Sequence, residues 1–422
     1  MKKILFVCYG SGHVRMVLPV ARAIGEAALA EVVILGLTTA ADAVRAAGLP
    51  LLQIKDFIQP GDERALAHGA RLRASMGAVA DPQETDAYLG LSYAELEDEV
   101  GPQEAARRYA RDGRQAFLPQ RLLGRILDAV RPDLVFATNS PRAERGAILA
   151  ARQRGLPAVC LVDLFAIDEV RWIGQGGYAD AVCVLNEQVR QFLVQAGRQP
   201  HEIRVTGNPA FDALQSPALA HQGRQLRRDR GWEARRVVLW PEQEEPAVHP
   251  FDGRPGDPAL PARVRDCLVQ WALTHPDAVL CVRPRAGQGA PDLPAHPRIV
   301  LTGQDWPLAP LLHAVDAVVT LTSTVGLEGH LAGARLVQVQ GSVFDEAMPL
   351  GRFGIADESV PLPQLPAALE RVTRIDASGR RDLPGITPEI DRESGAAEGQ
   401  DAASDPAEGA TSRVVRVVAG FL

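Results

Sequence analysis

Apolar residues follow two different spacings at the start of the chain. Residues 4–8 form a short apolar run that ends before a glycine, which is typical of a strand buried on both faces of a parallel sheet. From residue 17 to residue 28, apolar positions recur every three or four residues, as on one face of an amphipathic helix. The pattern therefore predicts a tight turn at residues 10–12 that joins the carboxyl end of a strand to the start of a helix.

Short apolar runs alternate with amphipathic stretches along most of the chain, which is the pattern of βαβ units in a doubly wound sheet. The segment Gly207-Asn208-Pro209 separates two such sets, because glycine and Asn-Pro interrupt regular structure. We therefore expect an α/β protein with two Rossmann-like domains, residues 1–208 and 209–375, facing each other across a cleft. The predicted strands are residues 4–8, 32–37, 134–138, 158–162, 181–185 and 203–206, then 237–240, 279–282, 298–301, 317–321 and 336–339.

Three segments depart from this alternation. Residues 57–115 are charged and helix-prone without a clear strand, which predicts a helical insertion near the cleft. Residues 376–409 are rich in Gly, Ala, Pro, Ser and charged residues, and such a segment cannot offset its ordering entropy, so a flexible loop is expected. Residues 410–422 place Val414, Val417, Val418 and Phe421 on one helical face, which predicts a closing helix that docks on a domain.

The composition of the chain argues against several classes of partner. A net charge of −7 without a basic stripe argues against nucleic acid. The five cysteines are scattered through apolar runs, which favours buried thiols in a reducing compartment over a metal site or disulfides. No apolar run approaches the length of a membrane span, and the apolar patch at the start is too short for a signal peptide. We expect a cytoplasmic protein without an integral membrane segment, and peripheral membrane contact stays open.

The predicted turn after the first strand carries candidate chemistry. Glycines let a backbone approach a ligand closely, and the following helix start offers unpaired N–H groups to an anion. The spacing is not the dinucleotide fingerprint G-x-G-x-x-G, which disfavours a dehydrogenase. The histidine can accept a proton near neutral pH, although it could instead cap the helix or pack against Tyr9. The candidate residues are Gly10, Ser11, Gly12, His13 and Arg15.

A second candidate follows the strand predicted at residues 317–321. Hydroxyl side chains at the start of the next helix can cap it and, with free N–H groups, hold a phosphate. Glu328 lies one turn further along, where a carboxylate could accept both hydroxyls of a ribose. The alternative is an ordinary helix cap with a solvated glutamate. The candidate phosphate-binding residues are Ser323, Thr324, Val325 and Gly326, preceded by Thr322.

Two arginines and one loop complete the candidate site of the second domain. Arg283 and Arg285 follow the strand at residues 279–282 and could neutralise a diphosphate, although arginines at strand ends are often only solvated. The loop from Gly303 to Leu308 could hold a flat base through main-chain hydrogen bonds, with Trp306 beside it.

Together these residues resemble the GT-B group of nucleotide-sugar enzymes. The first turn is similar to the G-x-G-H turn of bacterial cell-wall N-acetylglucosaminyltransferases and of the nucleotide-sugar hydrolase of pseudaminic acid synthesis. The segments "VCVLNEQVRQFLVQAGRQPHEIRVTGNPAFDAL" and "TLTSTVGLEGHLAGARLVQV" resemble UDP-N-acetylglucosamine 2-epimerases and capsule-type polysaccharide glycosyltransferases. The similarity covers most of residues 1–375 and the last helix, which in this group crosses back onto the N-terminal domain.

The resemblance implies a nucleotide-sugar substrate, with His13 as general base or sugar contact, Ser323, Thr324 and Gly326 at the diphosphate, and Glu328 at the ribose. The segment "WPEQEEPAVHP" lacks the basic H-R-x-E-N type motif of the epimerases, and the hydrolase has its arginine one place later than Arg15. We therefore expect an inverting glycosyltransferase that uses a UDP-linked donor and a saccharide or other hydroxyl acceptor, with no metal and no cofactor. An epimerase, a hydrolase and a non-catalytic nucleotide-sugar-binding regulator are the alternatives.

Overall fold

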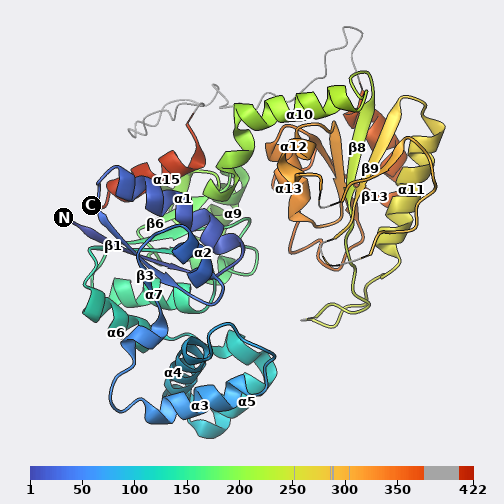
Figure 1. The fold of residues 1–422 in the computed structure, drawn as a ribbon. Helices are drawn as coiled ribbons and strands as arrows, with labels where there is room; N and C mark the ends of the chain where they lie inside the picture. Colours follow the sequence, from blue (N-terminus) through green and yellow to red (C-terminus); the bar gives the residue numbers. More distant parts are fainter. Residues whose placement is uncertain (251, 286, 288, 304, 375–407) are drawn as a thin grey trace. The chain divides into compact units, whose positions relative to one another are not determined.

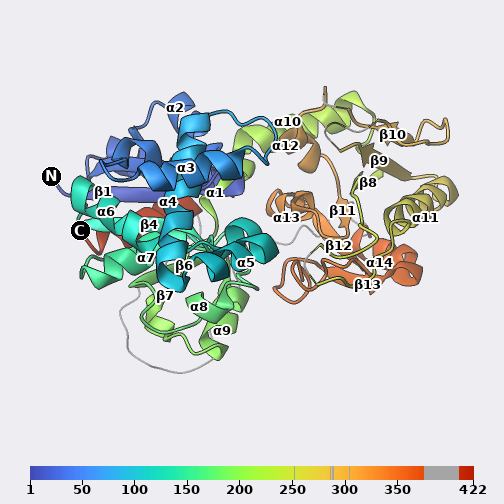
Figure 2. The same ribbon diagram turned by 90° about the horizontal axis from the view of Figure 1, so that it is seen from below.

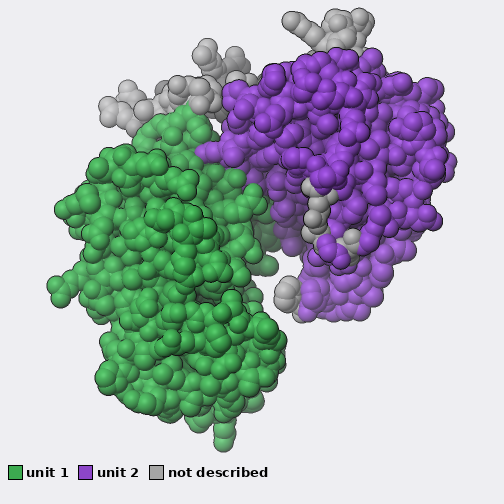
Figure 3. Space-filling view, viewed as in Figure 1, with its two compact units in different colours: residues 1–210, 407–422 green, residues 211–406 purple. Residues whose placement is uncertain are grey.

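The computed structural model describes residues 1–374 and 408–422, except residues 251, 286, 288 and 304. The chain forms two compact units (Figure 3), of which unit 1 comprises Met1–Ala210 with Ala407–Leu422 and unit 2 comprises Phe211–Pro406. The loop expected at residues 376–409 lies outside the described residues, apart from its last two positions.

Unit 1 is built on a parallel sheet of seven strands in the order β3-β2-β1-β4-β5-β6-β7, the strand order of a doubly wound nucleotide-binding fold with one further strand. The predicted strands are all present, and β3 is additional because two residues are too short to give a pattern. The strands are β1 (Lys3–Cys8), β2 (Glu31–Gly36), β3 (Leu51–Leu52), β4 (Leu134–Thr138), β5 (Ala158–Leu161), β6 (Ala181–Val184) and β7 (Ile203–Val205).

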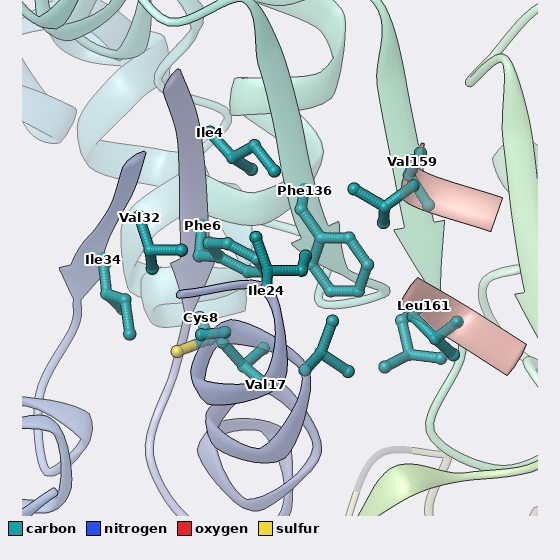
Figure 4. Close-up of a cluster of buried hydrophobic side chains, with 14 of the residues drawn as sticks. Ile4, Phe6, Cys8, Val17, Ile24, Val32, Ile34, Phe136, Val159 and Leu161 are labelled. Atoms are coloured by element: carbon teal, nitrogen blue, oxygen red, sulfur yellow. The ribbon is translucent and has the colours of Figure 1, made fainter. Parts of the chain in front are cut away.

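Both faces of this sheet are covered, which explains the continuous apolar runs of its strands. Ile4, Phe6 and Cys8 point into a core shared with α1 (Gly12–Glu26), and Figure 4 shows Phe6 and Phe136 beside side chains of that helix. Leu5 and Val7 are equally buried on the opposite face, where α7 (Ala143–Gln153) contacts β1, β4 and β5. The further helices that flank the sheet are α2 (Ala40–Ala46), α6 (Gln120–Val130), α8 (Val170–Ile173) and α9 (Glu187–Gln195).

The C-terminal helix α15 (Ala410–Ala419) belongs to unit 1 and lies beside α1 (Figure 1). Val414 and Val418 are fully buried in the core of that unit. Arg413 donates a hydrogen bond from Nε to the carbonyl oxygen of Thr206 at 2.8 Å. The expected return of the last helix to the N-terminal domain is confirmed.

Between β3 and β4, the chain forms the helices α3 (Glu63–Arg73), α4 (Pro82–Val100) and α5 (Pro102–Asp112), which Figure 2 also shows. Gly69 and Gly90 let α3 and α4 approach each other closely. A Cβ atom at Gly69 would lie 1.9 Å from the carbonyl oxygen of Asp86, and one at Gly90 would lie 2.0 Å from that of Ala65. Short 3-10 helices at Ile54–Phe57 and Gly113–Ala116 flank this segment.

Unit 2 repeats the same architecture with a parallel sheet of six strands in the order β10-β9-β8-β11-β12-β13. Helices α11 (Leu260–Thr274) and α14 (Leu365–Val372) share one core with the sheet, and α13 (Thr324–Leu331) contacts β11 and β12 from the other face. The other elements are β8 (Arg236–Pro241), β9 (Ala278–Arg283), β10 (Ile299–Leu301), β11 (Ala317–Thr320), β12 (Arg335–Gln340), β13 (Glu358–Pro361), α10 (Pro217–Asp229) and α12 (Leu308–Leu312).

The predicted α/β architecture with two doubly wound sheets is therefore confirmed. The five cysteines are free thiols, four of them buried and Cys267 half-buried. Within residues 1–374 and 408–422, every helix falls short of the combination of length and apolar character that a membrane crossing requires.

Candidate functional site

Open α/β sheets bind ligands at the carboxyl ends of their strands, where the strand order reverses. In unit 1 this switch point lies between β1 and β4, and in unit 2 it lies between β8 and β11. His13 follows β1, and Ser323 follows β11, so each predicted motif lies at the switch point of its own sheet.

The glycine turn of unit 1 is tight. Ser11 adopts a left-handed backbone with φ of 60° and precedes α1, which begins at Gly12. A Cβ atom at Gly10 would lie 1.8 Å from Oγ1 of Thr39, so Gly10 packs against the loop after β2. Ser11, Gly12 and Arg15 are exposed, which leaves the outer side of the turn accessible to a ligand.

His13 belongs to a hydrogen-bonded chain that crosses the switch point. Its Nδ1 lies 2.7 Å from Oγ1 of Thr138, the last residue of β4. The Thr138 hydroxyl donates to Oε1 of Glu144 at 3.3 Å, and the same oxygen accepts the backbone N–H of Tyr9 at 2.8 Å. In this arrangement Nδ1–H of His13 donates to Thr138, and the basic lone pair of the imidazole lies on Nε2.

Burial shifts the pKa values of two groups in this hydrogen-bonded chain, His13 and Glu144. The pKa of His13 is lowered by burial, with a smaller contribution from Arg142, while Asp163 acts in the opposite direction. The neutral imidazole is therefore favoured at neutral pH, as a general base requires. Burial also raises the pKa of the Glu144 carboxyl to about 7, although its hydrogen bond from Tyr9 opposes this shift.

Further polar residues gather at the same edge of unit 1. The amide of Asn139 donates to Oδ1 of Asp163 at 3.0 Å and accepts the backbone N–H of Asp163 at 3.0 Å. Asn208 donates to the backbone oxygen of Asp163 at 2.7 Å. Sequence reasoning missed these residues and Thr138, although a polar residue directly after each buried strand was the available signal.

Unit 2 contains a cavity of about 460 Å³ at its switch point. It is lined by residues 241–244 at the end of β8, 283–285 at the end of β9, 322–325 after β11 and Phe344 after β12. Its volume falls in the range of small-molecule sites, about 300–1,000 Å³. The residues predicted from the sequence that line this cavity are Arg283, Arg285, Ser323, Thr324 and Val325.

The turn between β11 and α13 is held in place by side chains. Ser323 caps α13, and its Oγ accepts the backbone N–H of Val325 at 3.2 Å. Oε1 of Gln243 accepts the hydroxyl of Thr320 at 3.1 Å and the backbone N–H of Thr322 at 3.0 Å. Sequence reasoning missed Gln243, which fixes the start of the helix beside the cavity.

Gly326 and Glu328 lie outside the lining of this cavity. A Cβ atom at Gly326 would lie 2.7 Å from Cγ2 of Thr320 and 2.9 Å from Cδ1 of Leu336, so this glycine lets α13 lie close to the sheet. Glu328 is half-buried in α13. The structure therefore gives Gly326 a packing role, and its contact with a phosphate stays a prediction.

The two predicted arginines have different partners. Arg283 donates to the backbone oxygen of Trp306 at 2.9 Å, and its pKa is lowered by burial, with Asp305 acting in the opposite direction. Arg285 forms an ion pair with Glu244, and both side chains are more than half exposed. Arg283 thus supports the loop after β10, whereas Arg285 is the more available cation.

Trp306 does not offer the ring surface expected beside a base. Only 9% of the residue is exposed, and its ring stacks on Trp232 with the centroids 6.0 Å apart. The guanidinium carbon of Arg230 lies 4.2 Å from the ring centroid. The backbone of Gly303 and of residues 305–308, which lead into α12, is the described part of this loop that stays a candidate for base recognition.

In the part of the chain that the structure describes, no group of three or more His, Cys, Asp or Glu side chains comes together in a way that could hold a metal ion.

Comparison with known proteins found one partial match to a family model and several similar solved structures. Residues 270–347 match a family model described as capsule polysaccharide biosynthesis protein, and this segment contains Arg283, Arg285 and the start of α13. Comparison with curated proteins gave no match. A glycotransferase of kitacinnamycin has a similar structure, with a TM-score of 0.51 and 16% identity over 90% of this chain and 92% of that one. The UDP-N-acetylglucosamine 2-epimerase of Methanocaldococcus jannaschii gives a TM-score of 0.51 and 11% identity over 99% of each chain. The chain thus has the GT-B fold, two Rossmann-like units in tandem, that is found in nucleotide-sugar enzymes.

Proposed function

We propose that this protein is a glycosyltransferase of polysaccharide synthesis that moves a sugar from a UDP-linked donor to an acceptor hydroxyl. The observation that carries the proposal is the cavity of unit 2, which joins a capped helix start and an available arginine at the switch point of the sheet. The family match over residues 270–347 supports polysaccharide synthesis, because it includes most of this site. The donor, the reaction and the acceptor are parts of the proposal.

The donor diphosphate would bind at the start of α13. The first N–H groups of a helix lack carbonyl partners inside the helix and carry partial positive charge, which favours an anion. Thr324 lines the cavity and is exposed, so its hydroxyl can add a hydrogen bond. Arg285 can bind two phosphate oxygens at once if its pair with Glu244 opens.

The acceptor would be activated in unit 1. Nε2 of His13 takes the proton of the acceptor hydroxyl while the oxygen attacks the anomeric carbon of the donor sugar. The oxygen attacks from the face opposite the bond to the diphosphate. That bond breaks and its electron pair leaves with UDP, so the configuration at the anomeric carbon inverts. The transfer requires the sugar of a donor bound by unit 2 to reach an acceptor oxygen at His13.

An epimerase would use the same donor, and the fold is shared with one. The segment after β8 carries Glu242 and Glu244 in the cavity lining, where the epimerases are expected to carry a basic motif. Glu242 pairs with Arg265 at 3.3 Å, and Glu244 pairs with Arg285. These carboxylates favour transfer over epimerisation.

The test is incubation of the full chain with UDP-N-acetylglucosamine, UDP-glucose and GDP-mannose, each with and without a panel of saccharide acceptors. We expect UDP release that depends on the acceptor, together with a new glycoside in the mass spectrum. Release of UDP in water alone indicates a hydrolase, and a sugar inverted at carbon 2 indicates an epimerase. Binding of UDP without any turnover across the panel supports the regulator and contradicts the proposal.

A further inference from the structure

Two arginines at the start of α7 share an unusual environment, and we refer to Arg142 and Arg145 as the arginine pair. They follow β4 and are three residues apart at the helix start, so they lie on neighbouring positions of one side. Both are half-buried and lie against aromatic rings. The guanidinium carbon of Arg142 is 4.7 Å from the ring centroid of Tyr9, and that of Arg145 is 4.6 Å from the ring centroid of Trp172.

Neither arginine of the pair has a carboxylate within ion-pair distance in the described parts of the chain. The other end of the same helix behaves differently. Arg152 there pairs with Asp180, and Arg154, directly after the helix, pairs with Asp128 at 2.8 Å. The ion pairs of this helix therefore lie at one end. At the other end burial acts to lower the pKa of Arg142, but Tyr9, Tyr88 and Glu144 outweigh it and raise that pKa.

Hydrogen-bonding groups around the arginine pair also lack partners. Nε of Arg142, Nε of Arg145, the indole N–H of Trp172 and the hydroxyl of Tyr178 are all shielded from solvent, and none has a hydrogen-bond partner among the described residues. Trp172 and Tyr178 are only 7% and 6% exposed. Oε2 of Glu144, between the two arginines in the sequence, is an acceptor that also lacks a partner among the described residues. Buried donors without acceptors are costly and rare, and in this cluster the unpartnered donors outnumber that acceptor.

The local charge has the same sign. The guanidinium carbon of Arg171 lies 5.2 Å from the ring centroid of Trp172, and Arg145 contacts the same ring. The pKa of Arg145 is lowered by burial and by Arg171, with Tyr178 acting in the opposite direction. Glu144 is fully buried, hydrogen-bonded to Tyr9 and Thr138, and its raised pKa of about 7 leaves it only partly ionised at neutral pH.

We infer that the arginine pair, together with the indole N–H of Trp172, binds a negatively charged group of the acceptor, either a carboxylate or a phosphate. Guanidinium groups recognise both through paired N–H donors, which would satisfy the unpartnered nitrogen atoms. The identity of the ligand as an acceptor rests on the proposed function, whereas the anion site itself does not. Glu144, which lies between the two arginines in the sequence, accepts the hydroxyl of Thr138, and Oγ1 of Thr138 lies 2.7 Å from Nδ1 of His13.

The same contact would assist the proposed base. Arg142 contributes to lowering the pKa of His13. An anion bound at Arg142 would offset this positive charge, so binding of the acceptor would make His13 a stronger base at the moment when it is needed. A neutral acceptor would lack this effect.

The experiment measures binding to the full chain by titration calorimetry without nucleotide, using inorganic phosphate, D-glucuronate and neutral D-glucose as probes. We expect one or both anions to bind and glucose not to bind. The double variant R142Q/R145Q should weaken anion binding by at least about tenfold, because hydrogen bonds to charged groups are lost. The variant R152Q/R154Q makes the same change of charge at the other end of the helix and should bind the anions as the natural chain does.

Two further variants separate binding from folding. W172F keeps an aromatic ring beside Arg145 but removes the indole donor, so a several-fold loss of affinity is expected. R142K and R145K keep the positive charge and lose the paired donors, and they give a readout if the double variant folds poorly by circular dichroism. Equal binding of both anions and glucose, or equal binding by R142Q/R145Q and R152Q/R154Q, overturns the inference.

The source of the anion follows from the probes: binding of glucuronate alone assigns a carboxylate, and binding of phosphate alone assigns a phosphoryl group. Binding of UDP is measured separately in the natural chain and in S323A, because UDP is itself an anion. Anion binding that is lost in R142Q/R145Q, in a protein that neither binds nor turns over UDP-sugars, would sustain the anion site and contradict the proposed function. Turnover of UDP-sugars by a protein that binds neither anion would support the proposed function and contradict the anion site.

Discussion

The carboxyl edges of the two sheets share a strand order and differ in their chemistry. In each unit one side-chain oxygen bridges the switch point by accepting a threonine hydroxyl and a backbone N–H. Glu144 does this in unit 1, with Thr138 and Tyr9, and Gln243 does it in unit 2, with Thr320 and Thr322. In unit 1, where the candidate base lies, the bridging group is the carboxyl of Glu144, which can titrate. In unit 2, where the diphosphate is expected to bind, the bridging group is the neutral amide of Gln243.

The arginines at the two sheet edges also differ in whether they form an ion pair. In unit 2, Arg285 beside the cavity is paired with Glu244, whereas Arg142 and Arg145 in unit 1 have no such partner among the described residues. A preformed cavity beside an exposed arginine, whose pair with Glu244 can open, suits a charged ligand that must later leave. A titrating carboxyl beside two arginines that lack an ion pair among the described residues suits proton transfer from an anionic substrate.

The largest effect is expected from His13→Ala. If this variant kept its activity, the assignment of proton transfer to unit 1 would be wrong. Loss of a general base lowers turnover by about 10²–10⁴-fold. Affinity for UDP should stay unchanged, since the described lining of the cavity comes only from unit 2. Steady-state kinetics and a UDP titration check both parts. Thr138→Val, which removes the partner of Nδ1, should cause a smaller loss, and normal turnover of His13→Ala would remove the residue from the proposed role.

The carboxyl of Glu144 should make the stability of the protein depend on pH. The folded-state pKa of Glu144 is raised from 4.5 to about 7, so its stabilising contribution is complete below the unfolded pKa and is lost as the pH rises through the folded pKa. This costs the natural chain up to about 3 kcal/mol of unfolding free energy between about pH 5 and pH 8. Glu144→Gln should lose less stability over that interval, as measured by urea unfolding at both pH values.

Two other carboxyls provide the background for this measurement. Burial raises the pKa of Glu84 and of Glu169 to about 7 as well, and both remain in the variant. The difference between the two pH curves therefore isolates Glu144. Parallel curves for the two proteins would show that this carboxyl does not titrate as inferred.

A smaller effect is expected from Ser323→Ala in unit 2. The variant loses the cap of α13, which is worth about 1 kcal/mol, so UDP affinity should fall by about fivefold to tenfold. Ser216→Ala is the matched control, because Ser216 precedes α10 in the same unit without a side-chain capping bond. Calorimetric titration with UDP compares the two, and equal affinities would argue against a diphosphate at α13.

The smallest effect is expected from Glu244→Gln, which releases Arg285. Both partners are more than half exposed, and such ion pairs contribute about 0.2–1 kcal/mol, so UDP affinity should rise about twofold to fivefold at low salt. The gain should disappear at high ionic strength because exposed charges are screened. A fall in affinity would indicate that Glu244 itself contacts the ligand.

The regular elements were largely readable from the sequence. The strand predicted at residues 134–138 is β4 to the residue, since a strand buried on both faces must be apolar throughout. β13 escaped prediction because only Val360 of its four residues is buried. The polar and glycine residues at strand ends could also be located, because parallel strands bring their carboxyl ends to one edge.

The partners of those residues could not be read in this way. The tripeptide Pro-Arg-Ala occurs at residues 141–143 and again at 284–286, each time soon after a buried strand. Arg142 lies over Tyr9, whereas Arg285 pairs with Glu244. Trp306 likewise looked like a ligand surface and lies against Trp232. Local sequence determined where strands end and which side chains stand there. Tertiary structure alone decided which charges are neutralised, because each partner comes from a distant segment brought close only by folding.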